Sequence, residues 1–182
     1  MNVIYLLSEH ISNQIAAGEV IQRPASVVKE LLENSIDSGA NEIKIFIKDG
    51  GRTSILVQDN GKGMTADDAV LSFKRHATSK LKRVNDLFKM QTKGFRGEAL
   101  ASVSAIAQVT MKTKHKDSKE QAISIEYSVG KLMEKEDSVC DTGTLIEVKN
   151  IFYKKIFSSH FIVTLFRIWW YTSLVNPIKL CV

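Results

Sequence analysis

Cysteine and proline are scarce in this sequence, with two of each among 182 residues. Cys140 and Cys181 have no CxxC partner and no metal-ligand spacing, a usage that fits a reducing compartment. The N-terminus has no basic segment followed by a sustained apolar stretch, which argues against a secretory signal peptide. We therefore expect a cytoplasmic protein if the source is bacterial and a nuclear one if it is eukaryotic.

Internal repeats, low-complexity linkers and a GxxxxGK[ST] motif are also absent from the sequence. The missing motif excludes a P-loop NTPase. With 44% hydrophobic residues, most of the chain is expected to be ordered, and its length corresponds to about one domain. The sequence therefore indicates a globular protein with one sizeable core.

Acidic residues are missing from the C-terminal stretch, which makes the net charge of +5 misleading. Residues 1–153 hold 21 Lys/Arg against 20 Asp/Glu, whereas residues 154–182 hold four basic residues and no acid. The basic balance therefore says little about nucleic acid binding by the main part of the chain. Locally, residues 74–96 hold eight Lys/Arg and one acid. Such a cluster suits the phosphates of a nucleotide or a nucleic acid, and it equally describes a solvated helix–loop surface.

Hydrophobic periodicity and turn residues predict the order of helices and strands. Helical segments are expected over 8–22, 25–38, within 64–88, and over 98–107, with a glycine-rich loop at 92–97. Strands are expected over 42–48 and 54–59, joined by a turn at 49–51, and over 108–114, 121–128 and 143–150. Because the order is not a strict βαβ alternation, the predicted class is α+β, with a mixed, mainly antiparallel sheet and helices on one face.

The helix over 25–38 has an apolar face and an acidic face. At 100° per residue, its apolar side chains fall within one half of the wheel, and the opposite arc carries Glu30, Glu33, Asn34 and Asp37. No lysine is interleaved in this arc, so the carboxylates would repel one another if merely exposed. A divalent cation or a water to be activated would explain the arrangement, since Mg²⁺ prefers oxygen ligands. An ordinary acidic solvent face remains the alternative.

The turn Asp59-Asn60-Gly61-Lys62-Gly63 follows the second strand directly. Its two glycines let the backbone approach a flat ligand closely, and the Asp59 carboxylate can accept a hydrogen bond from an exocyclic amine such as that of adenine. A plain turn is the alternative, because Asp-Asn-Gly is favoured turn chemistry. Gly61-x-Gly63-x-x-Ala66 also matches a dinucleotide-binding fingerprint weakly, but the required second strand ending in an acid is not found.

The segment Thr92 to Leu100 places two glycines around a Phe-Arg pair just before a helix. Backbone N–H groups at a helix N-terminus favour phosphate, and Lys93 and Arg96 add positive charge. Together, the acidic helix with its asparagine, the Asp-x-Gly-x-Gly turn and this loop are more specific than any one of them alone.

That ordered set resembles the GHKL ATPases, the group of gyrase B, the heat-shock ninety chaperones, histidine kinases and MutL. Within the group, the chain is similar to the MutL mismatch-repair family over about residues 8–153. The matching strings are NQIAAGEVIQRPASVVKELLENSIDSGA at 13–40, DNGKGM at 59–64, RHATSK at 75–80 and GFRGEALASVSAIA at 94–107. The resemblance implies a GHKL-type (Bergerat) ATP-binding domain over residues 1–153.

The resemblance also implies roles for individual residues. Glu30 would be the general base for the attacking water, Asn34 would hold Mg²⁺, and Asp59 would bind the adenine amino group. Gly61 and Gly63 would let the base lie against the backbone. The remaining residues implied to contact ATP are Thr78, Ser79 and Lys80 in a flexible lid, Gly94, Phe95, Arg96, Gly97, Glu98, Ala99 and Leu100 around the phosphates, and Thr144 on the adenine side.

As a family property, the resemblance implies weak Mg²⁺-dependent ATP hydrolysis and ATP-driven dimerisation that closes a clamp on DNA. The implied partners are a MutS-type mismatch recognition protein, a MutL-type dimer partner and DNA. A nucleotide-binding or partner-binding module that does not hydrolyse ATP is the alternative, because the sequence departs from the family after Tyr153 and a second, transducer-like domain is expected to be missing.

Residues 154–182 are acid-free and rich in aromatic residues. We interpret this tail first as the product of a frameshift, an unspliced intron or a truncated gene copy. A docked helix or strand is the second interpretation. A membrane anchor is disfavoured, because Arg167 interrupts an apolar run shorter than the ~20 residues that a span needs.

Overall fold

A computed structural model describes residues 5–6, 8–78, 97–151 and 179–181. In chain order, its helices are α1 (Glu9–Val20), α2 (Pro24–Asp37), the 3-10 turn η1 (Asp49–Gly51), α3 (Ala66–Leu71) and α4 (Ala99–Ile106). Its strands are β1 (Glu42–Lys48), β2 (Ser54–Asp59), β3 (Gln108–Lys114), β4 (Ala122–Ser128), β5 (Lys131–Ser138), β6 (Gly143–Lys149) and β7 (Lys179–Cys181). None of the helices in these residues is long and apolar enough to cross a membrane.

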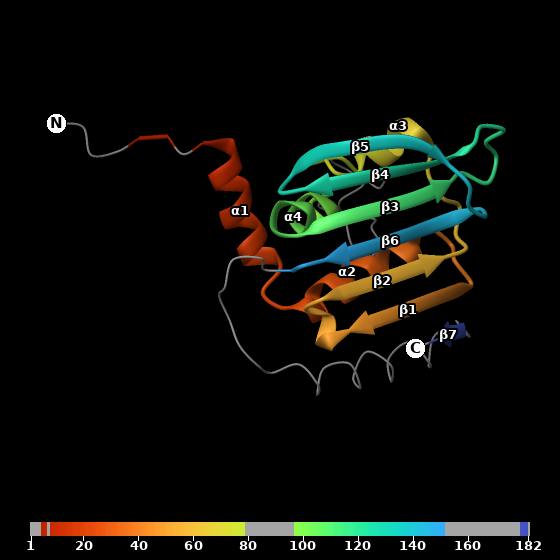
Figure 1. Cartoon of the computed structure of the whole chain (residues 1–182), viewed down its shortest axis with the longest axis horizontal. Coiled ribbons are helices and arrows are strands. Elements are labelled where there is room, and N and C mark those ends of the chain that lie inside the picture. Colours follow the sequence, from red (N-terminus) through yellow and green to blue (C-terminus); the bar gives the residue numbers. More distant parts are fainter. Residues whose placement is uncertain (1–4, 7, 79–96, 152–178, 182) are drawn as a thin grey trace, which may run out of the picture.

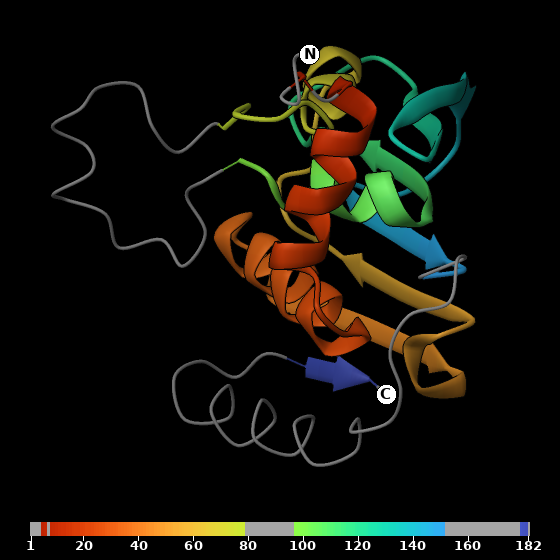
Figure 2. The ribbon, with the colours of Figure 1, turned by 90° about the vertical axis from the view of Figure 1, so that its left-hand side faces the viewer.

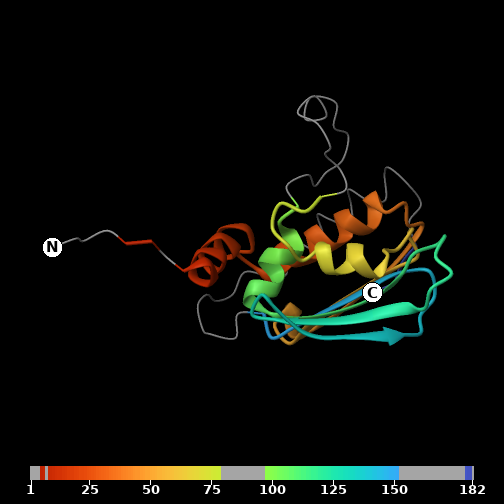
Figure 3. The ribbon, with the colours of Figure 1, turned by 90° about the horizontal axis from the view of Figure 1, so that it is seen from above.

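The strands form one sheet in the order β5-β4-β3-β6-β2-β1-β7 (Figure 1). Every pairing among β1 to β6 is antiparallel, and only the short β7 runs parallel to its neighbour β1. Figure 2 shows β7 at the β1 edge of the sheet. The predicted fold class is therefore confirmed: the sheet is mixed and mainly antiparallel, and Figure 3 shows the helices in a layer over one of its faces.

The alternation of side chains along the strands decides which face the helices cover. Inward-facing residues of β1, β2, β6, β3 and β4 are buried in matching rows, for example Ile45, Val57, Ile146, Met111 and Ile125. The opposite face of the sheet carries mostly polar or half-exposed side chains. One buried face and one wetter face are what an antiparallel sheet of this kind allows.

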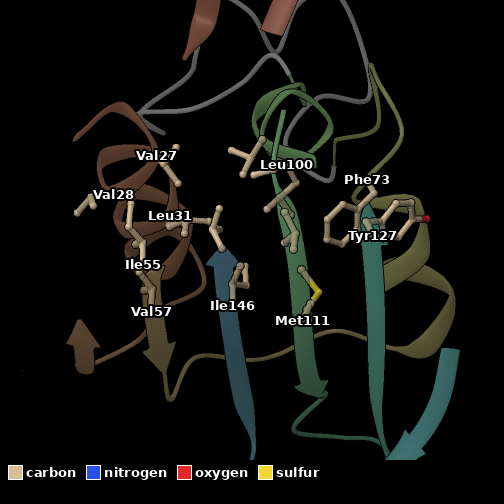
Figure 4. Packing of buried hydrophobic residues seen from close by; sticks show 14 of the residues in the cluster. Val27, Val28, Leu31, Ile55, Val57, Phe73, Leu100, Met111, Tyr127 and Ile146 are labelled. Atoms are coloured by element: carbon tan, nitrogen blue, oxygen red, sulfur yellow. The ribbon is translucent and has the colours of Figure 1, made fainter. Parts of the chain in front are cut away.

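Helix α2 covers the sheet with the predicted apolar face, on which Val27, Val28 and Leu31 are buried, and the helix packs against β2 (Figure 4). Helix α4 lies beside it and is buried along most of its length. Near α3, the ring of Phe73 stacks on Tyr127 of β4, with centroids 4.2 Å apart. Helix α1 packs against α4 at one end of the domain rather than over the sheet (Figure 1).

Most predicted elements have the expected bounds. Strands β1, β2 and β3 match the predicted ranges, and α2 begins at Pro24 and ends in a turn at Gly39, whose φ is +79°. Strand β5 was not predicted because residues 131–137, most of them charged, are all exposed and give no buried alternation. In the segment 64–88, α3 is the helix within the described part, and residues 79–88 lie outside the described residues.

Candidate functional site

The carboxylate of Asp59 is held at the end of β2, on the sheet face that α2 covers. Its Oδ2 accepts a hydrogen bond from Ser35 Oγ of α2 at 2.8 Å, and its Oδ1 accepts one from the Gly61 N–H at 2.9 Å. The Ser35 side chain can reach Asp59 because it lies on the buried face of α2, one turn after Leu31 and Leu32. The carboxylate is thus fixed in orientation by one helix and one turn.

Burial raises the pKa of the Asp59 carboxyl above its ordinary value. Hydrogen bonds to the carboxylate, led by those from the Gly61 N–H and the Ser35 hydroxyl, offset only part of this effect. A partly desolvated carboxylate with unused lone pairs is a strong acceptor for a ligand N–H group. This property distinguishes Asp59 from an ordinary turn aspartate in water.

Thr144 and Thr113 lie next to Asp59 in one row across three strands. Asp59 of β2 pairs with Thr144 of β6, and Thr144 pairs with Thr113 of β3. Both threonines are buried, with exposed fractions of 8% and 1%. Sequence reasoning named Thr144 but missed Thr113. The signal that could have found Thr113 is its position, since period two places this polar residue on the same inward face as Val109 and Met111.

The glycines of the Asp59 turn have close neighbours within the domain. A Cβ added at Gly61 would lie 2.7 Å from the Cβ of Ser38, and one added at Gly63 would lie 2.6 Å from the carbonyl carbon of Lys114. Gly63 also has a φ of +64°, which disfavours other residues. Close packing of the turn against α2 and β3 therefore requires both glycines, whether or not a flat ligand also approaches them.

Gly63→Ala is expected to lower the free energy of unfolding by at least about 2 kcal/mol, because it adds left-handed strain to a backbone clash. Gly18→Ala is the matched control: Gly18 is in α1, a Cβ there meets nothing within 4 Å, and a helical alanine is favourable by about 1 kcal/mol. Urea unfolding of both variants measures the difference. Equal stabilities for the two variants would contradict the packing assigned to Gly63.

Helix α2 also presents Glu30 and Asn34, one turn apart and both half-buried. The expectation of an unpaired acidic arc is wrong: Lys29 Nζ lies 3.4 Å from Glu30 Oε1 and 3.1 Å from Glu33 Oε2. A lysine side chain is long enough to reach from the edge of the arc to its neighbour and to the residue one turn ahead. Burial alone would lower the pKa of Lys29, but hydrogen bonds and Coulombic attraction from the two glutamates more than offset this and raise it.

The start of α4 is tied to the segment after α3. Glu98 Oε1 lies 3.3 Å from Arg75 Nη2 and 3.2 Å from His76 Nδ1, while Arg75 Nη1 donates to Asn13 Oδ1 of α1 at 3.0 Å. Gly97 has a φ of +61° and packs against the Ala77 carbonyl. The Glu98 side chain is therefore engaged within the protein.

The predicted site residues fall into four groups. Asp59, Gly61, Gly63 and Thr144 are brought together around the turn after β2. Gly97, Glu98, Ala99 and Leu100 begin α4, which packs beside the α2 helix of Glu30 and Asn34. Thr78 is the last residue of the described segment after α3, and it interacts with another residue of the protein. The residues predicted for the lid and loop that lie outside the described residues are Ser79, Lys80, Gly94, Phe95 and Arg96.

Two competing sites are less well supported. A dinucleotide-binding turn should join parallel strands, whereas β2 is antiparallel to both of its neighbours, β1 and β6.

An open hollow of about 280 Å³ lies at the end of the sheet near Lys44, Gln58 and Lys112. These three side chains project from the face opposite α2, and Asp59 and Thr144 also line the hollow. Among the described residues, no group of three His, Cys, Asp or Glu could hold a metal.

Comparisons with known proteins place these features in context. Residues 22–156 match the family described as Histidine kinase-, DNA gyrase B-, and HSP90-like ATPase. The chain is 55% identical over 152 residues to the DNA mismatch repair protein MutL of Flavobacterium psychrophilum, and 50% identical to that of Parabacteroides distasonis. These matches cover 84% of this chain and 25% of each relative, so the chain spans about a quarter of their length.

Solved structures agree with the sequence comparisons. The N-terminal domain of a DNA repair protein is similar with a TM-score of 0.65 and 36% identity, over 81% of this chain and 43% of that one. The MutL ATPase domain of Aquifex aeolicus in complex with ADP is similar with a TM-score of 0.52 and 27% identity, over 74% of this chain and 45% of that one.

Proposed function

Because this chain belongs to the histidine kinase-, DNA gyrase B- and HSP90-like ATPase family and corresponds to the N-terminal ATPase region of MutL, we propose that it binds ATP between α2, the turn after β2 and the start of α4. The observation that carries the proposal is the buried Asp59 carboxylate, held by Ser35 and Gly61 on the helix-covered face of the sheet.

The base end of the proposed site is the row of Asp59 and Thr144. The exocyclic amine of adenine is a donor, and a carboxylate that keeps free lone pairs in a partly desolvated position is its natural acceptor. Gly61 and Gly63 hold the turn against α2 and β3, which supports a fixed position for this carboxylate. The adenine ring would lie beside the turn.

The phosphate end of the proposed site lies toward Asn34 and the start of α4. Gly97 and Glu98 lead directly into α4, a helix of eight residues that begins with Ala99 and Leu100, and the backbone N–H groups at such a terminus favour phosphate. Asn34 supplies a single oxygen donor, which fits Mg²⁺ because this ion keeps several waters and shares phosphate oxygens rather than demanding a cage of carboxylates. When bound, Mg²⁺ neutralises charge on the phosphates.

Hydrolysis to ADP and phosphate would depend on Glu30. The Glu30 carboxylate is one helical turn before Asn34 on the same face of α2, which supports a role as the base that orients a water and accepts its proton. Lys29 is 3.4 Å from Glu30 Oε1, so one oxygen is engaged and the other remains available. The competing function is a module that binds nucleotide or a partner without turnover.

The wider functions follow from the likeness to MutL alone. We propose a role in mismatch repair with ATP-driven dimerisation, a MutS-type partner, a MutL-type dimer partner and DNA. The domain boundary at residue 153 and the cytoplasmic or nuclear location remain predictions. Of residues 154–182, the short β7 pairs with β1, and the intervening residues 154–178 lie outside the described residues.

Calorimetric titration with ATP tests the proposed site. The chain is expected to bind ATP more tightly with Mg²⁺ than with EDTA, and Asn34→Ala is expected to remove that Mg²⁺-dependent gain, at least about tenfold in Kd, because a metal ligand is lost. The control is Gln22→Ala, which removes an exposed carboxamide just before α2. No binding of ATP by the unsubstituted chain would overturn the proposed function.

A further inference from the structure

The Thr113 hydroxyl lies at the centre of three hydrogen bonds behind the proposed base end. The N–H of Met64 donates to Thr113 Oγ1 at 3.0 Å, and Thr113 Oγ1 donates to the Gly143 carbonyl at 2.9 Å. The third neighbour is Thr144 Oγ1 at 3.1 Å. With an exposed fraction of 1%, the Thr113 side chain has no access to water that could exchange these partners.

The direction of the third hydrogen bond follows from counting protons. A threonine hydroxyl has one proton to donate and two lone pairs to accept with. A backbone N–H can only donate and a carbonyl can only accept, so Met64 uses one lone pair of Thr113 and Gly143 takes its proton. Only the second lone pair remains. Thr144 must therefore donate its own proton to Thr113 Oγ1.

This direction changes what Thr144 can offer to a ligand. With its proton turned toward Thr113, the Thr144 hydroxyl has only lone pairs left for other partners. Its cross-strand neighbour Asp59 is also an acceptor, because its carboxylate is oriented by two donors, Ser35 and Gly61. Both side chains at the base end consequently present acceptors and no donor.

We propose that Thr113 is a positioning residue that fixes Thr144 as an acceptor and makes this site select a 6-amino purine over a 6-oxo purine. The inference rests on the proposed function, in which the purine lies beside Asp59. A 6-amino group donates to such acceptors, whereas a 6-oxo group meets them with its own lone pairs and is left without a partner. Thr113 itself acts through Thr144.

The test compares ATP with ITP, which carries oxygen at C6 and a proton on N1, using calorimetric titration of the full chain. Wild type is expected to prefer ATP. In Thr113→Val, the Thr144 hydroxyl is free to rotate and donate to a 6-oxo group, so the ratio of the ITP and ATP Kd values should fall by about fivefold, the equivalent of one hydrogen bond. Thr113→Ser retains the hydroxyl and should restore the wild-type ratio.

Two further variants separate this role from general destabilisation. Val109→Ala removes a buried side chain from the same strand and face without touching the hydrogen bonds, and it should leave the ratio unchanged. If Thr113→Val does not fold, Thr113→Cys carries the same test, because a thiol fits the space but is a weak acceptor. An unchanged ratio in a folded variant lacking the hydroxyl would overturn the inference alone. Failure of wild type to bind ATP would overturn the proposed function and this inference together.

Discussion

Replacing Asp59 by asparagine is expected to weaken ATP binding severely while the domain stays folded. The amide is nearly the same size, but it loses the charge and half of the acceptor capacity that the adenine amine requires. Loss of a hydrogen bond to a charged group in a partly buried site corresponds to roughly a 100-fold weaker Kd. Calorimetric titration with ATP measures the change in Kd, and circular dichroism confirms that the variant is folded.

The same substitution is expected to stabilise the unliganded domain at neutral pH. Because burial raises the pKa of Asp59 above its ordinary value of 3.8, the folded state binds a proton more readily than the unfolded state. The contribution of Asp59 to stability is therefore fully present below that ordinary value and is lost as the pH rises through the higher pKa of the folded state. Asp59→Asn resembles the protonated form, so its advantage in unfolding free energy should shrink as the pH falls through that window.

The control for Asp59 is Asp49→Asn, an equal charge change at the exposed turn between β1 and β2. Asp49 pairs with Arg52 at the surface, so its substitution should not change the ATP affinity by a large amount. Wild-type ATP affinity in Asp59→Asn would contradict the base end of the site. Lower stability of Asp59→Asn at neutral pH would contradict burial as the dominant influence on this carboxyl.

Replacing Glu30 by alanine is expected to reduce ATP turnover by 10²- to 10⁴-fold, roughly the usual contribution of a general base, with little change in ATP affinity. Glu30 would act on the attacking water and would not hold the ground-state nucleotide. The turnover rate should therefore fall while the ATP affinity stays nearly unchanged. Single-turnover hydrolysis with excess protein measures the chemical step, and titration with a non-hydrolysable ATP analogue measures binding.

The chain offers a close control in Glu33. It lies on the same helix, is also partly buried and also pairs with Lys29 Nζ, at 3.1 Å. Glu33→Ala should therefore reproduce the loss of a carboxylate beside Lys29 without the loss of turnover. If the unsubstituted chain binds ATP but Glu30→Ala leaves the turnover rate unchanged, the enzymatic part of the proposal fails and the binding-only function is favoured.

The arrangement of one sheet with helices over one face could be predicted because the hydrophobic patterns in the sequence match the burial of the same residues in the structure. Strands β1, β2 and β3 alternate inward apolar residues with outward polar ones, and the apolar residues of α2 repeat at helical spacing. Strand β5 could not be predicted in this way. It is an exposed edge strand, and its backbone pairing with β4 leaves no hydrophobic pattern in the sequence.

Charge pairing on α2 shows a different limit of sequence reasoning. On a helical wheel, Lys29 points in a different direction from the acidic arc, but the wheel does not represent the length of the lysine side chain. In the structure, Lys29 Nζ contacts both Glu30 and Glu33. Side-chain reach is a tertiary property, so an arc that reads as unpaired on a wheel can be paired in space.

The residue types of the proposed site could be identified from the sequence alone. Local motifs identify these residues because each group lies within one short segment. Asp59 and its two glycines belong to one turn, and Glu30 and Asn34 belong to one helix. How Asp59 is held, and which threonine lies behind Thr144, depend on contacts between distant parts of the chain. Those contacts join Ser35 to Asp59 and Thr113 to Met64, Gly143 and Thr144, across separations of 24 to 49 residues. Register between strands creates them, and register depends on the packing of the whole sheet against its helices.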